Sequence, residues 1–119
     1  MADSNLSIHN IICPTDFSDF ATSAFAESVR LARWFGAKVT VVHVIPFAVP
    51  IASDMGYLPV PSEKDDARRQ ATLAELQRFV DATEHIGVPV GTLCREGDAC
   101  AEIRNVAQET VADLVVMGT

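Results

Sequence analysis

Residues 8–18 read Ile-His-Asn-Ile-Ile-Cys-Pro-Thr-Asp-Phe-Ser, and this stretch decides the fold. Its apolar part, residues 8–14, has Ile11, Ile12 and Cys13 side by side and ends at a proline and at Asp16. Adjacent apolar residues within a short run are typical of a strand that is buried on both faces. Such a strand belongs to the middle of a parallel sheet with helices on both sides.

Strands and helices alternate along the rest of the chain. The predicted elements that follow are a helix over residues 19–35, a strand over 39–45, a helix over 62–86, an edge strand over 88–94, a helix after Asp98 and a buried strand over 113–117. Residues 46–61 hold four of the six prolines and predict a long loop, either a flap packed on the domain or a ligand lid or partner surface. The β-α-β-α-β-α-β order predicts a doubly wound α/β domain with a parallel sheet.

Composition and charge bound the function. The chain has 119 residues, 49% of them hydrophobic, which suits a single domain. Nine Lys and Arg against 16 Asp and Glu give a net charge of -7, which disfavours binding to nucleic acid or to a membrane surface. With no long apolar run and no leader-like start, the chain is expected to be cytoplasmic. Three cysteines without C-x-x-C spacing and three scattered histidines predict neither a disulfide framework nor a metal site.

Three strand ends carry the candidate site, because ligands of open α/β sheets bind beyond the carboxyl ends of the strands. These ends read Pro14-Thr15-Asp16-Phe17-Ser18, His43-Val44-Ile45 and Met117-Gly118-Thr119, and they converge if the first and last strands are neighbours. Asp16 can accept hydrogen bonds from ribose hydroxyls or an amine, and Thr15 can donate to ribose or phosphate oxygens. Two alternatives stay open: Asp16 and Ser18 could only cap the first helix, and Gly118 could only be a turn glycine.

Taken together, the Pro-Thr-Asp-Phe-Ser turn, His43-Val44 at the end of the second strand, Gly97 before the third helix and the final Asp-Leu-Val-Val-Met-Gly-Thr resemble the universal stress protein family over the whole chain. The resemblance implies a Rossmann-like fold with sheet order 3-2-1-4-5, a homodimer and, in one subclass, bound ATP. It also implies an adenosine pocket in which Val44 meets the adenine edge through its main chain. The nucleotide-binding residues implied in this way are Pro14, Thr15, Asp16, Val44, Met117 and Gly118.

One part of the family pattern is not in this sequence. The resemblance implies a G-x2-G-x9-G-[ST] phosphate loop after Met-Gly-Thr, and the sequence ends at Thr119. We therefore expect one universal stress protein domain over residues 1–119 with strand order 3-2-1-4, lacking the phosphate loop and the helix and fifth strand that follow it. Binding of ATP, alone or with Mg²⁺, is then expected to be weakened or lost. With its fourth strand at an edge, the chain is expected to form a homo-oligomer or to be poorly soluble.

The leading functional hypothesis is a nucleotide-binding stress-response module that acts by binding and dimerisation. One alternative is an interaction module that binds no nucleotide, and another is a slow ATP hydrolase. No P-loop, positioned base or phosphate-directed lysine is visible in the sequence, so we predict no catalytic residues. A phosphoacceptor receiver domain is disfavoured, because the third strand ends in Cys94-Arg95 instead of an aspartate.

Overall fold

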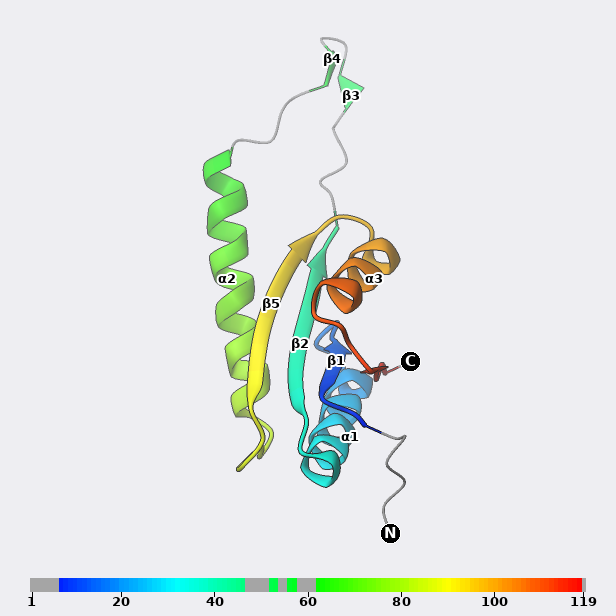
Figure 1. The fold of residues 1–119 in the computed structure, drawn as a ribbon. Helices are drawn as coiled ribbons and strands as arrows, with labels where there is room; N and C mark the ends of the chain where they lie inside the picture. Colours follow the sequence, from blue (N-terminus) through cyan, green and yellow to red (C-terminus); the bar gives the residue numbers. More distant parts are fainter. Residues whose placement is uncertain (1–6, 47–51, 54–55, 58–61, 119) are drawn as a thin grey trace.

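A four-stranded parallel sheet lies at the centre of the structure (Figure 1). The computed structural model describes residues 7–46, 52–53, 56–57 and 62–118. The sheet contains β1 (Asn10–Pro14), β2 (Lys38–Ile45), β5 (Val90–Glu96) and β6 (Leu114–Val115), in the spatial order β5-β2-β1-β6. Since β3 and β4 are not part of this sheet, β5 and β6 are its third and fourth strands in chain order. The predicted strand order 3-2-1-4 and the Rossmann-like, doubly wound α/β fold class are therefore confirmed.

Helices cover both faces of the sheet. On one face, α1 (Asp19–Phe35) and α2 (Ser62–Asp81) form a core with alternate residues of β1 and β2, such as Cys13 and Val41. On the other face, α3 (Ala99–Glu109) packs Val106 against Ile12 and Val42. The three adjacent residues Ile11, Ile12 and Cys13 are fully buried, which confirms that the first strand is covered on both sides.

The first helix follows its sequence signals closely. The hydroxyl of Ser18 accepts a hydrogen bond from the amide of Ala21 at 3.2 Å and caps the helix, as cap-type residues do at this position. The helix ends at Gly36, which has a left-handed φ of 69° that glycine adopts at little cost. The four residues predicted at helical spacing are all buried: Ala21, Phe25, Val29 and Ala32.

The second helix is shorter than predicted. It ends at Asp81, and the predicted end at Gly87 is wrong. The last core contact is made by Val80, and Thr83 and Glu84, which follow at the next turn, offer no large apolar side chain to the core. The chain tightens there, with the Thr83 amide bonded to the Val80 carbonyl at 3.2 Å. Gly87, with φ of 81°, lies in the turn that leads into β5.

The last two strands of the sheet also differ from their predicted bounds. β5 begins at Val90 and runs to Glu96, two residues later than expected, and pairs with β2 along its whole length as an edge strand. β6 covers two residues only, and the prediction that 113–117 is buried throughout is wrong, because Val115 and Met117 are exposed. Val115 and Met117 lie on the face of the sheet opposite α1, which is the face where α3 packs over β2 and β5.

Most of the predicted loop over residues 46–61 lies outside the described residues. Within it, β3 (Ala52–Ser53) pairs with β4 (Gly56–Tyr57) as a separate antiparallel sheet. The choice between a flap and a lid stays a prediction. In the part of the chain that the structure describes, no helix is both long enough and apolar enough to cross a membrane.

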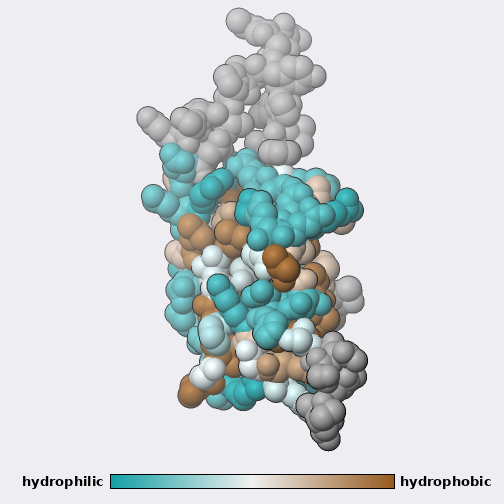
Figure 2. Space-filling view, viewed as in Figure 1, coloured by the Kyte–Doolittle hydropathy of each residue, from teal (hydrophilic) through white to brown (hydrophobic). Residues whose placement is uncertain are grey.

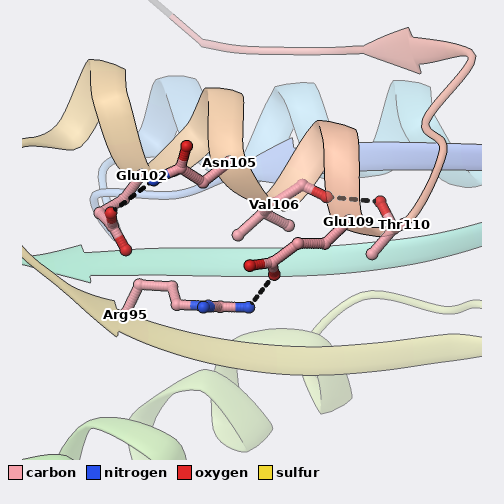
Figure 3. A network of polar contacts seen from close by, with 6 residues as sticks. All are labelled: Arg95, Glu102, Asn105, Val106, Glu109 and Thr110. Atoms are coloured by element: carbon pink, nitrogen blue, oxygen red, sulfur yellow. Dashed lines mark hydrogen bonds and ion pairs between the residues drawn. The ribbon is translucent and has the colours of Figure 1, made fainter.

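Polar contacts fix α3 against the edge of the sheet (Figure 3). The guanidinium of Arg95 on β5 forms an ion pair with Glu109 in the last turn of the helix. At the other end, the carboxylate of Asp98 accepts from the Ala101 amide at 2.9 Å, which confirms the predicted cap. On the face shown in Figure 2, hydrophobic residues appear in small separate areas between hydrophilic ones.

Candidate functional site

A cleft of about 180 Å³ opens at the carboxyl ends of the strands. Pairing of β1 with β6 brings the three predicted strand ends to one place, because these two strands are neighbours in the sheet. All six residues that the sequence singled out for nucleotide binding line this cleft. The complete lining is Pro14, Thr15, Asp16, Ala21, Val42, His43, Val44, Ala99, Ile103, Met117 and Gly118.

The turn after β1 is held by a dense set of short-range hydrogen bonds. The Thr15 hydroxyl accepts from the Phe17 amide at 2.9 Å, and the Asp16 carboxylate accepts from the Ser18 amide at 3.0 Å. Phe17 has a φ of 66°, a left-handed conformation that is unusual for a residue with a side chain. Its ring packs on His43 with 4.7 Å between ring centroids. The turn is therefore a defined structure that presents Thr15 and Asp16 to the cleft.

Asp16 lies at the surface of the cleft and is exposed to solvent. Hydrogen bonds from the hydroxyl and then the backbone amide of Ser18 hold the pKa of the Asp16 carboxyl below its ordinary value of 3.8. The helix cap itself is Ser18, so Asp16 supports the turn without capping α1 directly. Asp16 is thus an ionised acceptor at neutral pH, and its exposure leaves lone pairs free for a ligand.

Val44 presents its backbone to the cleft. The amide of Lys38 bonds to the His9 carbonyl, and the carbonyl of Val42 accepts from the Thr15 amide at 2.8 Å. The backbone amides and carbonyls of the even-numbered residues of β2 therefore point toward β1. Alternate residues of a strand in a parallel pair direct both backbone groups to the same neighbour. Val44 continues this series beyond the end of β1, where the register stops at Pro14 and Val42. Its amide and carbonyl therefore point toward the cleft.

Gly118 approaches the start of α1 closely. A Cβ atom at this position would lie 2.3 Å from the Phe20 carbonyl oxygen and 2.8 Å from the Ala21 nitrogen. Both are backbone atoms within the helix, which cannot move aside as a flexible side chain could. The absence of a side chain lets the segment after β6 lie against α1 and form one wall of the cleft.

Four of the lining residues were not predicted to belong to the site, namely Ala21, Val42, Ala99 and Ile103. Ile103 and Ala21 were read as core residues of their helices, and Val42 as part of a buried strand. Ala99 follows the Asp98 cap directly, and a helix that returns from a strand in a βαβ unit begins at the carboxyl end of the sheet. The βαβ topology thus indicates that Ala99 and Ile103, in the first turns of α3, lie near the carboxyl end of the sheet.

Two of the three cysteines, Cys13 and Cys94, are buried, and Cys100 is exposed. Burial raises the pKa of the Cys13 thiol and of the Cys94 thiol, so both stay protonated at neutral pH. In residues 7–46, 52–53, 56–57 and 62–118, no three side chains of His, Cys, Asp or Glu lie close enough together to hold a metal ion.

Comparisons with known proteins agree with the fold. The sequence profile of the universal stress protein family matches residues 7–119. Universal stress protein MJ0531 of Methanocaldococcus jannaschii is 32% identical over 112 residues, which cover 92% of this chain and 63% of that protein. The chain thus spans less than two thirds of the length of that relative.

Solved structures extend the comparison to three dimensions. A protein of the universal stress protein family from Burkholderia pseudomallei superposes with a TM-score of 0.73 at 24% identity, covering 94% of this chain and 82% of that one. A universal stress protein in complex with cAMP superposes with a TM-score of 0.62 at 20% identity, covering 93% and 73%. The profile match over nearly all of the sequence, supported by these likenesses, shows that this chain belongs to the universal stress protein family.

Proposed function

We propose that this chain is a nucleotide-binding stress-response module whose cleft takes the adenosine part of an adenine nucleotide. The observation that carries the proposal is the convergence of six predicted residues, from three separate segments of the sequence, on one cleft. The solved relative that holds cAMP supports an adenine nucleotide as the ligand class. In this proposal the protein acts by binding and by forming a homodimer, and it is not an enzyme.

The chemistry of the lining fits the parts of an adenosine molecule. The exposed Asp16 carboxylate can accept hydrogen bonds from ribose hydroxyls. The Thr15 hydroxyl accepts from the Phe17 amide and keeps its own hydrogen available for a ribose or phosphate oxygen. The backbone of Val44 offers one donor and one acceptor to the edge of a base. The apolar walls supplied by Ile103 and Met117 suit the faces of a purine ring.

The charge of the described lining favours the nucleoside over the phosphates. Among the lining residues that the structure describes, Asp16 carries the single carboxylate, and none is Lys or Arg. A triphosphate is repelled by a carboxylate and finds no cationic side chain there, so most of the affinity in this cleft is expected to come from adenosine. ATP, alone or with Mg²⁺, and cAMP are both candidate ligands. The same lining offers no lysine and no carboxylate beyond Asp16 to promote hydrolysis.

The test compares two variants of the same turn. Asp16→Ala removes the proposed ribose acceptor, and we expect a loss of adenosine affinity of about tenfold or more, as for a hydrogen bond to a charged group. The melting temperature should change by a few degrees at most, because Asp16 is exposed and does not cap α1. Affinity is measured by isothermal titration calorimetry with adenosine, cAMP and ATP.

Ser18→Ala is the matched control, because it removes the α1 cap but keeps the Ser18 amide that bonds to Asp16, and Ser18 does not line the cleft. Loss of the cap should cost about 1 kcal/mol of stability and leave the adenosine affinity within a factor of two or so. If Asp16→Ala lowers stability while the affinity is unchanged, Asp16 has a structural role only. If the wild-type chain binds none of the three ligands, the alternative of an interaction module without nucleotide is supported instead.

A further inference from the structure

The side chain of His43 makes an unusual contact at the point where β1 leaves the sheet. Its Nδ1 atom lies 2.7 Å from the carbonyl oxygen of Thr15, and since a carbonyl can only accept, Nδ1 carries the hydrogen. His43 comes from β2, directly before Val44, and points to the face of the sheet opposite α3. There its ring lies 4.7 Å from that of Phe17, which in turn contacts Phe79 of α2 edge-on at 5.9 Å.

The Thr15 carbonyl is the group that the next ladder hydrogen bond would use. In a parallel pair, the Thr15 amide bonded to the Val42 carbonyl would be followed by the Val44 amide bonded to the Thr15 carbonyl. The register of β1 with β2 instead stops at Pro14 and Val42, and the Thr15 carbonyl receives His43. The imidazole therefore takes the place of a backbone donor and ends the ladder one bond early.

We propose that His43 is a positioning residue for ligand binding: by bonding to the Thr15 carbonyl it keeps the Val44 amide free for the ligand and fixes the turn that carries Asp16. The inference rests on the proposed function for its ligand, and on the hydrogen bond and the register for its mechanism. The Phe17 ring holds the imidazole in place from one side. His43 makes no bond to the ligand itself in this role.

Two variants of His43 test separately the hydrogen bond that it donates to Thr15 and the packing of its ring on Phe17. His43→Phe keeps an aromatic ring against Phe17 but cannot donate to Thr15, and His43→Asn keeps a donor near the Nδ1 position but loses the ring. We expect His43→Phe to weaken adenosine binding by about tenfold, because the Val44 amide can then bond to the Thr15 carbonyl. His43→Asn should retain affinity within about threefold of the wild type.

Two measurements on the ligand-free protein test the mechanism without adenosine. Nitrogen-15 NMR of the imidazole should show hydrogen on Nδ1. Amide hydrogen exchange should be at least about tenfold faster at Val44 than at Val42, which lies inside the ladder, and the difference should shrink in His43→Phe. A protected Val44 amide in the wild type, or full adenosine affinity in a folded His43→Phe, would overturn the inference.

These readouts also keep the two proposals apart. If the wild type fails to bind adenosine, the proposed function is wrong, and the exchange pattern still decides whether His43 ends the ladder. If the wild type binds adenosine and the Val44 amide becomes protected on binding, while His43→Phe binds weakly, both are supported. If adenosine binds and exchange at Val44 does not change, Val44 does not meet the ligand, and the role given to His43 is refuted.

Discussion

Phe17 allows a sharp test of the turn, because its backbone and its side chain have opposite effects on stability. A φ of 66° costs a residue with a Cβ atom about 1 kcal/mol relative to glycine. The ring offsets this cost, since it is partly buried and packs on His43 and Phe79. Truncation of a fully buried Phe costs about 3–5 kcal/mol, so a half-buried ring should contribute about 2 kcal/mol.

These magnitudes predict an order of stability that reverses the usual one for alanine and glycine. Phe17→Ala loses the ring and keeps the strain, so it should be less stable than the wild type by about 2 kcal/mol. Phe17→Gly loses the ring and relieves the strain, so the net loss should be about 1 kcal/mol. Phe17→Gly should therefore be more stable than Phe17→Ala by about 1 kcal/mol, or about 4 °C in melting temperature.

Urea unfolding followed by circular dichroism measures the difference, provided that the slopes of the transitions are equal. The control is Ala26→Gly on the exposed side of α1, where the same exchange of alanine for glycine should cost about 1 kcal/mol. If Phe17→Ala is as stable as Phe17→Gly or more so, the backbone at this position is not left-handed. The description of the turn, and of the site built on it, would then be wrong.

Two further predictions concern residues on either side of β6, Gly118 and Asp113. Gly118→Ala should weaken adenosine binding and lower stability by about 1–3 kcal/mol, because the new methyl group would meet the backbone of Phe20; calorimetry and thermal unfolding measure both. Asp113 accepts from the amides of His9 at 2.7 Å and Asn10 at 3.0 Å, which hold its pKa below 3.8. Because the pKa of Asp113 is lower in the folded than in the unfolded state, its ionised carboxylate stabilises the folded protein at pH values above the unfolded pKa. Asp113→Asn should therefore be less stable than the wild type at neutral pH. Urea unfolding should show the difference in stability between the two proteins decreasing as the pH falls below about 4.

The first strand and helix could be predicted from the sequence because their signals are local. Three adjacent apolar residues, a serine cap and a glycine at the end of the helix each act within a few residues of their own position. The spatial order of the strands was implied by the family resemblance, since hydrophobic periodicity says which residues are buried but not which strands are neighbours. The order in the structure agrees with it.

What could not be predicted depends on contacts between distant segments. The periodicity of the second helix does not show that Val80 makes the last core contact, and so the end at Asp81 was missed. The hydrogen bond from the His43 side chain to the Thr15 carbonyl joins residues 28 positions apart. It depends on the rotamer of His43, which the residue type alone does not dictate. Ile103 looks like any core residue in the sequence: the βαβ topology places the start of α3 near the cleft, and the packing of α3 over β2 decides that Ile103 lines it.

The cleft lies where the backbone pairing of β1 with each of its two neighbours ends, and a different residue ends each pairing. Toward β6, the Val116 amide bonds to the Ile12 carbonyl at 2.9 Å, and the next donor in that ladder would be residue 14. Residue 14 is a proline, which has no amide hydrogen to give. Toward β2, His43 occupies the Thr15 carbonyl. Both ladders therefore end near the carboxyl end of β1, beside the cleft that Val44 and Gly118 line.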